Sequence, residues 1–135
     1  MSHWVKKHTE VLDNVKKPIL KDALKEMGKG FDESVKEIKN PWGHEFVDAA
    51  LLDNGVITNL GFNFIPKENE TEKFKLELVG DFYGTGLNEN KFMTQLSQMY
   101  QKHNVLNALE EQNWDVEDIN TNNQGELVIE ASQWA

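Results

Sequence analysis

The sequence contains no cysteine and no arginine. Without cysteine, the chain cannot form disulfides, thiolate nucleophiles, iron–sulfur clusters or cysteine-based zinc sites, and it suits a reducing compartment. Without arginine, it lacks the residue that reads base edges and holds phosphates through paired hydrogen bonds. We therefore expect no nucleic-acid binding from this acidic chain.

Long apolar runs are also absent. No stretch of about 20 apolar residues could span a bilayer, and residues 1–8 lack the apolar core of a signal peptide. We expect a soluble cytoplasmic protein with no membrane contact. A chain of 135 residues has the size of one domain, and one of that size buries roughly 68% of the surface exposed by its unfolded form. No repeat or linker divides it, so residues 1–135 are expected to form a single domain.

The net charge of −9 is unevenly distributed. Residues 1–39 hold nine lysines against seven acids, and residues 40–103 hold five against nine. Residues 104–135 hold seven acids and no lysine. Two interpretations are open: a solvated surface that keeps the protein soluble, or electrostatic steering toward a basic partner.

Hydrophobic periodicity predicts strands at residues 3–12, 30–38, 46–52, 56–65, 74–82, 114–119 and 127–131. The first helix follows Asn14, which can cap it, has Pro18 in its first turn and ends at Gly28. Asn88 caps a second, longer helix, whose apolar stripe from Phe92 to Leu109 is expected to lie on the sheet.

Asp53-Asn54-Gly55 joins two of these strands, and its Asn-Gly pair is a strong hairpin signal. The resulting order is β-α-β-β-β-β-α-β-β. It predicts an α+β fold in which two helices pack on one face of an antiparallel sheet of about six to seven strands.

Several segments resemble one known family. They are the opening Met1-Ser2-His3-Trp4, the first helix from Ile19 to Gly28, Asn54-Gly55 followed by Leu60-Gly61-Phe62, Leu78-Val79-Gly80-Asp81, and the stretches Phe92 to Tyr100 and His103 to Trp114. The family is the hypothetical chloroplast reading frame thirty-five group of cyanobacteria and red-algal plastids, a domain of unknown function. The sequence departs from the family pattern at Asn113-Trp114 and in the acidic loop 67–72. The resemblance implies an uncharacterised soluble protein of cytoplasm or plastid stroma. Members of the family are sometimes encoded near AAA-type ATPases, and that context favours an accessory or adaptor role, with such an ATPase as a candidate partner, over an enzyme.

No cofactor or metal is expected. The chain has four histidines but no His-x-x-x-His pair, and His3 and His8 would project to opposite faces of a strand. Gly84-Thr85-Gly86 lacks the Lys-Ser/Thr of a phosphate loop, and no Gly-x-Ser-x-Gly elbow is present.

An acid/base pair could be built from Asp81, at a strand end near Tyr83, and His44 or His103. The alternative is that Asp81 caps a turn and His103 is a core histidine with a satisfied ring. No catalytic residue is assigned, and the balance favours a protein that is not an enzyme.

Four tryptophans occur in this small chain, and aromatic side chains dominate protein interfaces. Trp4 and Trp134 lie near the two ends of the chain, where terminal strands could sit side by side. Trp42, in its Pro-Trp-Gly loop, is expected to face solvent. Alternatively, these indoles complete the core or cover sheet edges.

Two functions remain open. The first is a non-enzymatic module that binds a protein partner through a sheet edge or the aromatic loop. The second is a small-molecule-binding or enzymatic domain with a pocket near Asp81, Tyr83 and His103. The first requires an apolar surface patch, whereas the second requires a concave pocket with convergent polar groups.

Overall fold

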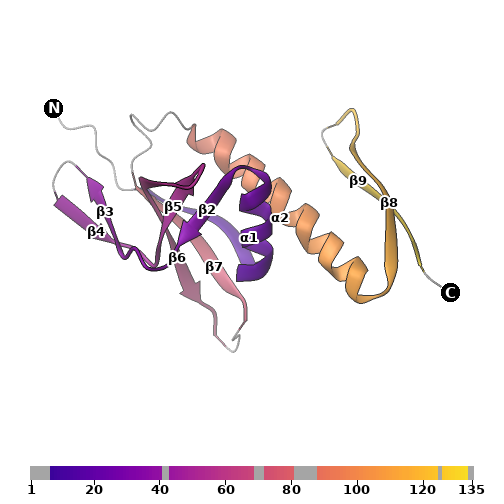
Figure 1. Ribbon diagram of the computed structural model, residues 1–135, viewed down its shortest axis with the longest axis horizontal. Coiled ribbons are helices and arrows are strands. Elements are labelled where there is room, and N and C mark those ends of the chain that lie inside the picture. Colours follow the sequence, from indigo (N-terminus) through magenta and orange to yellow (C-terminus); the bar gives the residue numbers. More distant parts are fainter. Residues whose placement is uncertain (1–6, 41–42, 69–71, 81–87, 125, 134–135) are drawn as a thin grey trace.

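The computed structural model describes residues 7–40, 43–68, 72–80, 88–124 and 126–133, and Figure 1 shows the arrangement of the chain. The elements are, in order, β1 (Lys7–Val15), α1 (Lys17–Glu26), β2 (Lys29–Asp32), β3 (Glu37–Asn40), β4 (Gly43–Phe46), β5 (Ala49–Asp53), β6 (Val56–Pro66), β7 (Phe74–Gly80), α2 (Glu89–Glu111), β8 (Trp114–Thr121) and β9 (Leu127–Gln133).

Five strands form the main sheet, in the order β1-β7-β6-β5-β2, and all neighbours in it are antiparallel. Both helices pack on one face of this sheet, because side chains of α1, α2 and the strands share one core cluster. The predicted α+β class and the predicted order of elements are confirmed.

The core lies between this face and the helices. Phe62, Leu76 and Leu78 from the central strands are almost completely buried against Leu20 and Leu24 of α1. The first half of α2 contributes Phe92, Leu96 and Tyr100. A smaller buried cluster of Ile38, Val47 and Val79 accompanies β3. Burial of these side chains supplies the main driving force for folding.

Local signals account for several boundaries. Pro18 stands in the first turn of α1, and Gly28 follows the helix with φ of +73°. Asn54 and Gly55 have φ of +50° and +83°, and Asp53 pairs with Val56. Two positive φ angles in a two-residue loop define a type I′ turn, so the predicted hairpin is confirmed. The side chain of Asn88 caps α2 by accepting a hydrogen bond from the Lys91 N–H.

Three details differ from the sequence-based expectation. The expected strand 30–38 is divided into β2 and β3, and β3 pairs with β4 in a separate hairpin. β8 and β9 also form a two-stranded sheet of their own. Asn14 does not cap α1: Lys16 occupies the N-cap without a side-chain hydrogen bond, and Asn14 instead takes φ of +56° at the end of β1.

The molecule is elongated. Figure 1 shows α2 running from the five-stranded sheet to the β8–β9 hairpin, which lies at the far end of the helix. The accessible surface is 8688 Å² for a mass of 15.5 kDa, whereas a compact monomer of this mass exposes about 7,200 Å². The molecule therefore exposes more surface than a compact monomer of its mass. Within the described part, neither α1 nor α2 is long and apolar enough to cross a membrane.

Candidate functional site

Most of the residues singled out from the sequence lie outside the part of the chain that the structure describes. This applies to Trp4, Trp42, Asp81, Tyr83 and Trp134. The predictions that Trp42 faces solvent and that a pocket forms near Asp81 and Tyr83 therefore stay predictions. The strands nearest the chain ends, β1 and β9, belong to different sheets.

His103 is described, and it contacts the first helix. Its Nε2 lies 3.1 Å from the Glu26 carboxylate at the end of α1, and its side chain is 21% exposed. Lys102 Nζ donates to both oxygens of the same carboxylate, at 2.9 and 3.0 Å. The hydrogen bond from Lys102, its positive charge and the contact with His103 lower the pKa of Glu26. This arrangement joins α1 to the middle of α2.

The described residues form no cluster of potential metal ligands. No three of their His, Asp and Glu side chains gather closely enough to hold an ion. His44, the other histidine considered for acid/base chemistry, lies in the β3–β4 hairpin, where its Nδ1 is 3.2 Å from Glu37. Its side chain is more than half exposed there.

A different feature distinguishes the C-terminal third, namely that its described side chains remain accessible to solvent. We call residues 101–133, the second half of α2 with β8 and β9, the arm. None of the arm residues with a described exposure is buried. The apolar stripe of α2 was expected to lie on the sheet along its length, but Leu106 and Leu109 are only half-buried. Val105 is 43% exposed.

The β8–β9 hairpin has two unlike faces. Val116 pairs with Ala131 and Ile119 pairs with Ile129, so these side chains share one face with Trp114. Each of the five is half-buried, whereas most polar residues of the hairpin are exposed. Because both strands contact α2, the apolar face is the one turned toward the helix.

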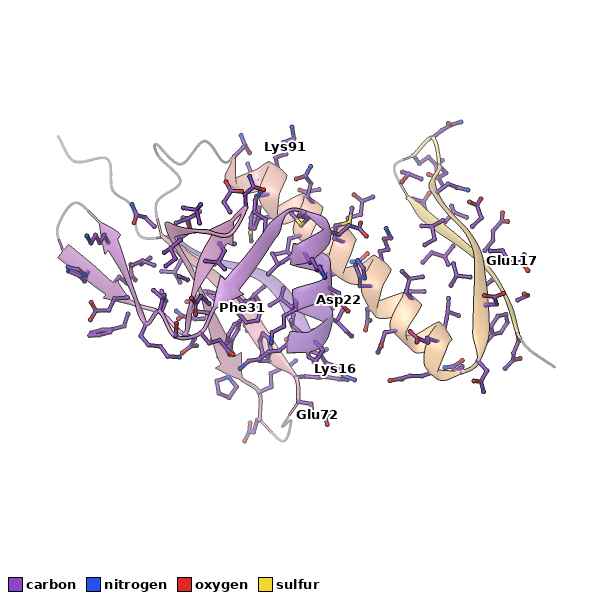
Figure 2. All side chains as sticks on the ribbon, in the orientation of Figure 1. Lys16, Asp22, Phe31, Glu72, Lys91 and Glu117 are labelled. Carbon is purple, nitrogen blue, oxygen red and sulfur yellow. The ribbon has the colours of Figure 1, made fainter. Side chains whose placement is uncertain are left out.

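The other face is acidic. Asp118 stands directly opposite Glu130, and Asp115 opposite Ser132. The Ser132 hydroxyl donates a hydrogen bond of 2.7 Å to Glu117, and Figure 2 shows Glu117 on the side of the hairpin turned away from α2. Like charges directly across a strand pair destabilise it, so the pairing of Asp118 with Glu130 does not stabilise the hairpin in the free protein.

The end of α2 carries the same sign of charge. Glu110 and Glu111 occupy its last turn, which holds no basic residue. The carboxyl end of a helix carries partial negative charge, so acids there are unfavourable. The arm therefore combines partly exposed apolar side chains with a concentration of negative charge that no lysine within residues 104–135 offsets.

The sequence identified the acidic C-terminal third as a steering surface and assigned partner binding to a sheet edge or the aromatic loop, without locating the arm. The alternation of apolar and acidic residues in 114–119 was the signal that could have located the arm, because it makes each strand two-faced. The exposure of Phe46 at the end of β4 was not anticipated either; its side chain is 78% exposed.

Residues 23–129 match a family described as protein of unknown function (DUF1257). This match includes the last four residues of α1, the whole of α2 and the greater part of the arm. No curated protein matches the chain, and no solved structure does.

Proposed function

The chain belongs to the DUF1257 family of proteins of unknown function, and from that premise we propose that it is a non-enzymatic module that binds a protein partner through its arm. One observation carries the proposal: the arm presents a row of apolar side chains, and none of those whose exposure is described is buried. A partner surface would complete the burial.

The sheet formed by β8 and β9 has only these two strands among the described residues. A two-stranded sheet is marginally stable in water unless a third strand or another surface covers it. Here α2 covers the apolar face only in part, because Trp114, Val116 and Ile119 all remain half-buried. Each square ångström of apolar surface that a partner removes from water contributes about 25 cal/mol. Binding therefore stabilises an element that the chain alone stabilises weakly.

The family resemblance supports a more specific role. It implies an accessory or adaptor protein of an AAA-type ATPase, in cytoplasm or plastid stroma. An arm that extends from a well-packed core suits such a role, because the core can remain unchanged while the arm engages the larger protein. An AAA-type ATPase is therefore the first partner to be sought.

The proposal is tested with the tagged full-length protein, purified from its native host at physiological salt, with retained proteins identified by mass spectrometry. We expect one protein in stoichiometric amount with the unaltered chain. Ile119→Glu places a charge on the apolar face of the arm and should abolish retention. Phe46→Ser, at the opposite end of the molecule, is the matched control and should retain the partner.

Circular dichroism must show that both variants keep the folded core. Equal retention by Ile119→Glu and the unaltered chain would exclude the arm as the binding surface. Failure to retain any protein in repeated preparations would count against the module itself, and a small-molecule screen of the region near Asp81 and His103 would then take priority.

A further inference from the structure

Within the part of the chain that the structure describes, no strand lies along the outer edge of β9. Among the described residues, β8 and β9 pair only with each other, so each strand has one edge without a strand partner. Such an edge presents unpaired backbone N–H and C=O groups on which another strand can add. The arm therefore offers backbone hydrogen bonds to a partner as well as apolar side chains.

The two edges are not equivalent. β8 contains an irregularity between Val116 and Asp118, where Glu117 is the extra residue. Bulges and charged side chains are the usual devices that protect an edge strand from pairing, and β8 has both, because Asp115, Glu117 and Asp118 are all acidic. β9 itself contains no extra residue, because each of its residues from Leu127 to Gln133 has a partner in β8. Glu130 is the single charged residue of β9. The β9 edge is the one suited to accept a strand.

A strand added beside β9 would extend both faces of the hairpin. Successive side chains of a strand point to opposite faces, so every second residue of the new strand would lie next to Ile129 and Ala131 on the apolar face. The residues between them would lie next to Glu130 and Ser132, close to Asp118 on the acidic face.

We propose that the partner binds by adding a third strand to the free edge of β9, and that this strand alternates apolar residues with lysine or arginine. The inference rests on the proposed function and specifies the chemistry of the bound segment. Backbone pairing of this kind supplies affinity, while alternate side chains supply specificity. A third strand also brings the sheet to the size at which it becomes independently stable.

The negative charge of the arm favours a basic protein strand over other binding partners. The arm lacks any lysine after residue 103, so the repulsion between Asp118 and Glu130 has no nearby basic residue from the same segment to relieve it. A second copy of the arm would add seven more acids. Nucleic acids and anionic membranes are repelled for the same reason. A basic protein segment is the class that gains from these charges.

The test uses the full-length protein and synthetic peptides as probes. One peptide alternates valine and lysine over the length of a strand, and a second has the same composition with the valines and lysines in separate blocks. We expect the alternating peptide to bind at least about tenfold more tightly in a nuclear magnetic resonance titration. It should slow hydrogen exchange of the amides of residues 127–133 and leave those of β6 unchanged.

The variant Glu130→Lys separates binding from folding. A lysine opposite Asp118 replaces repulsion by attraction, so the hairpin amides should exchange more slowly in the free protein. Binding of the valine–lysine peptide should nevertheless fall about tenfold, and a valine–glutamate peptide should bind better than it does to the unaltered chain. Asp22→Lys on α1 makes the same change in net charge and should leave peptide binding unchanged.

The outcomes distinguish the inference from the function on which it rests. If the native partner requires Ile119 but binds Glu130→Lys as well as the unaltered chain, the basic third strand is overturned and the interaction module stands. If the two valine–lysine peptides bind equally, or if neither protects residues 127–133, strand addition at β9 is likewise overturned. If the partner also binds Ile119→Glu as well as it binds the unaltered chain, both the interaction module and the strand addition at β9 are overturned.

Discussion

The phenolic oxygen of Tyr100 accepts a hydrogen bond of 2.8 Å from the backbone N–H of Lys16, the residue that caps α1. The two residues are 84 positions apart, and the contact fixes the middle of α2 against the junction between β1 and α1. The side chain of Tyr100 is almost fully buried, and the hydrogen bond itself is partly buried.

Tyr100→Phe should lower the free energy of unfolding by about 1 kcal/mol, because the Lys16 N–H loses its acceptor while the ring still packs in the core. Urea denaturation at neutral pH measures the difference. A loss of several kcal/mol would show instead that the substitution disturbs the packing of the ring.

The same tyrosine predicts a dependence on alkaline pH. Burial raises the pKa of Tyr100 above its usual value of 10.0. Because the pKa is raised in the folded state, the neutral Tyr100 side chain contributes to the free energy of unfolding. This contribution is fully present below pH 10 and is lost as the pH rises through the folded-state pKa. Tyr100→Phe should show a smaller loss of stability in this range. Identical pH profiles would contradict the assignment.

The contact between Glu26 and Lys102 predicts an effect at acidic pH. The pKa of Glu26 is lowered, mainly by the hydrogen bond from Lys102. The stabilisation is therefore present above pH 4.5 and is lost as the pH falls through the folded-state pKa. Glu26→Gln should cost about 0.5 kcal/mol at neutral pH, the usual range for a partly exposed pair. The difference from the unaltered chain should vanish in acid, as chemical denaturation across pH can show.

Two glycines provide a matched pair of variants. A Cβ added at Gly61 would lie 2.6 Å from Val47 Cγ1 and 3.0 Å from the Ala49 carbonyl oxygen, so Gly61→Ala should destabilise the protein by about 1–3 kcal/mol. A Cβ at Gly30 would meet Leu52 at an ordinary 3.8 Å. Gly30→Ala should be neutral or slightly stabilising, because it restricts the unfolded chain. Thermal denaturation compares the two, and equal effects would contradict the close approach at Gly61.

The arm predicts a gradient of local stability. Amides of β8 and β9 should exchange with solvent faster than those of β6 and β7, because the hairpin has no buried side chain with a described exposure, whereas β6 and β7 lie in the core. Hydrogen exchange followed by mass spectrometry measures this directly in the full-length protein. Uniform protection along the chain would show that the arm is as stable as the core.

Local chemistry was well predicted from the sequence. The Asn54-Gly55 turn, the Asn88 cap and the position of Pro18 depend on residues close together in the chain, and all three are present. The prediction that Asn14 caps α1 was wrong for a related reason. An Asn before a helix can serve as its cap or adopt a positive φ, and the residue itself does not distinguish these two uses.

Long-range pairing was harder to predict. Alternation identified β8 and β9 as strands with an apolar face, but it carries no information about which sheet a strand joins, so the hairpin was expected in the main sheet. The partner of His103 was equally hidden, because Glu26 is 77 residues away and only the packing of α2 on α1 brings them together. The turn between β2 and β3, where Asp32 accepts hydrogen bonds from the N–H and the hydroxyl of Ser34, falls inside the expected strand 30–38 and contains no Gly or Pro to mark it.

The pairing of β1 with β7 has a consequence for biosynthesis. Lys7 lies opposite Gly80 in the register, so β1, which is synthesised before the other strands of the main sheet, must wait for the last of them before it can pair. Contacts of such sequence separation slow folding, because a long loop must close before they form. We expect the contiguous β5–β6–β7 meander to form first and β1 to join afterwards, which leaves β1 available to chaperones for longer than any other strand of the sheet.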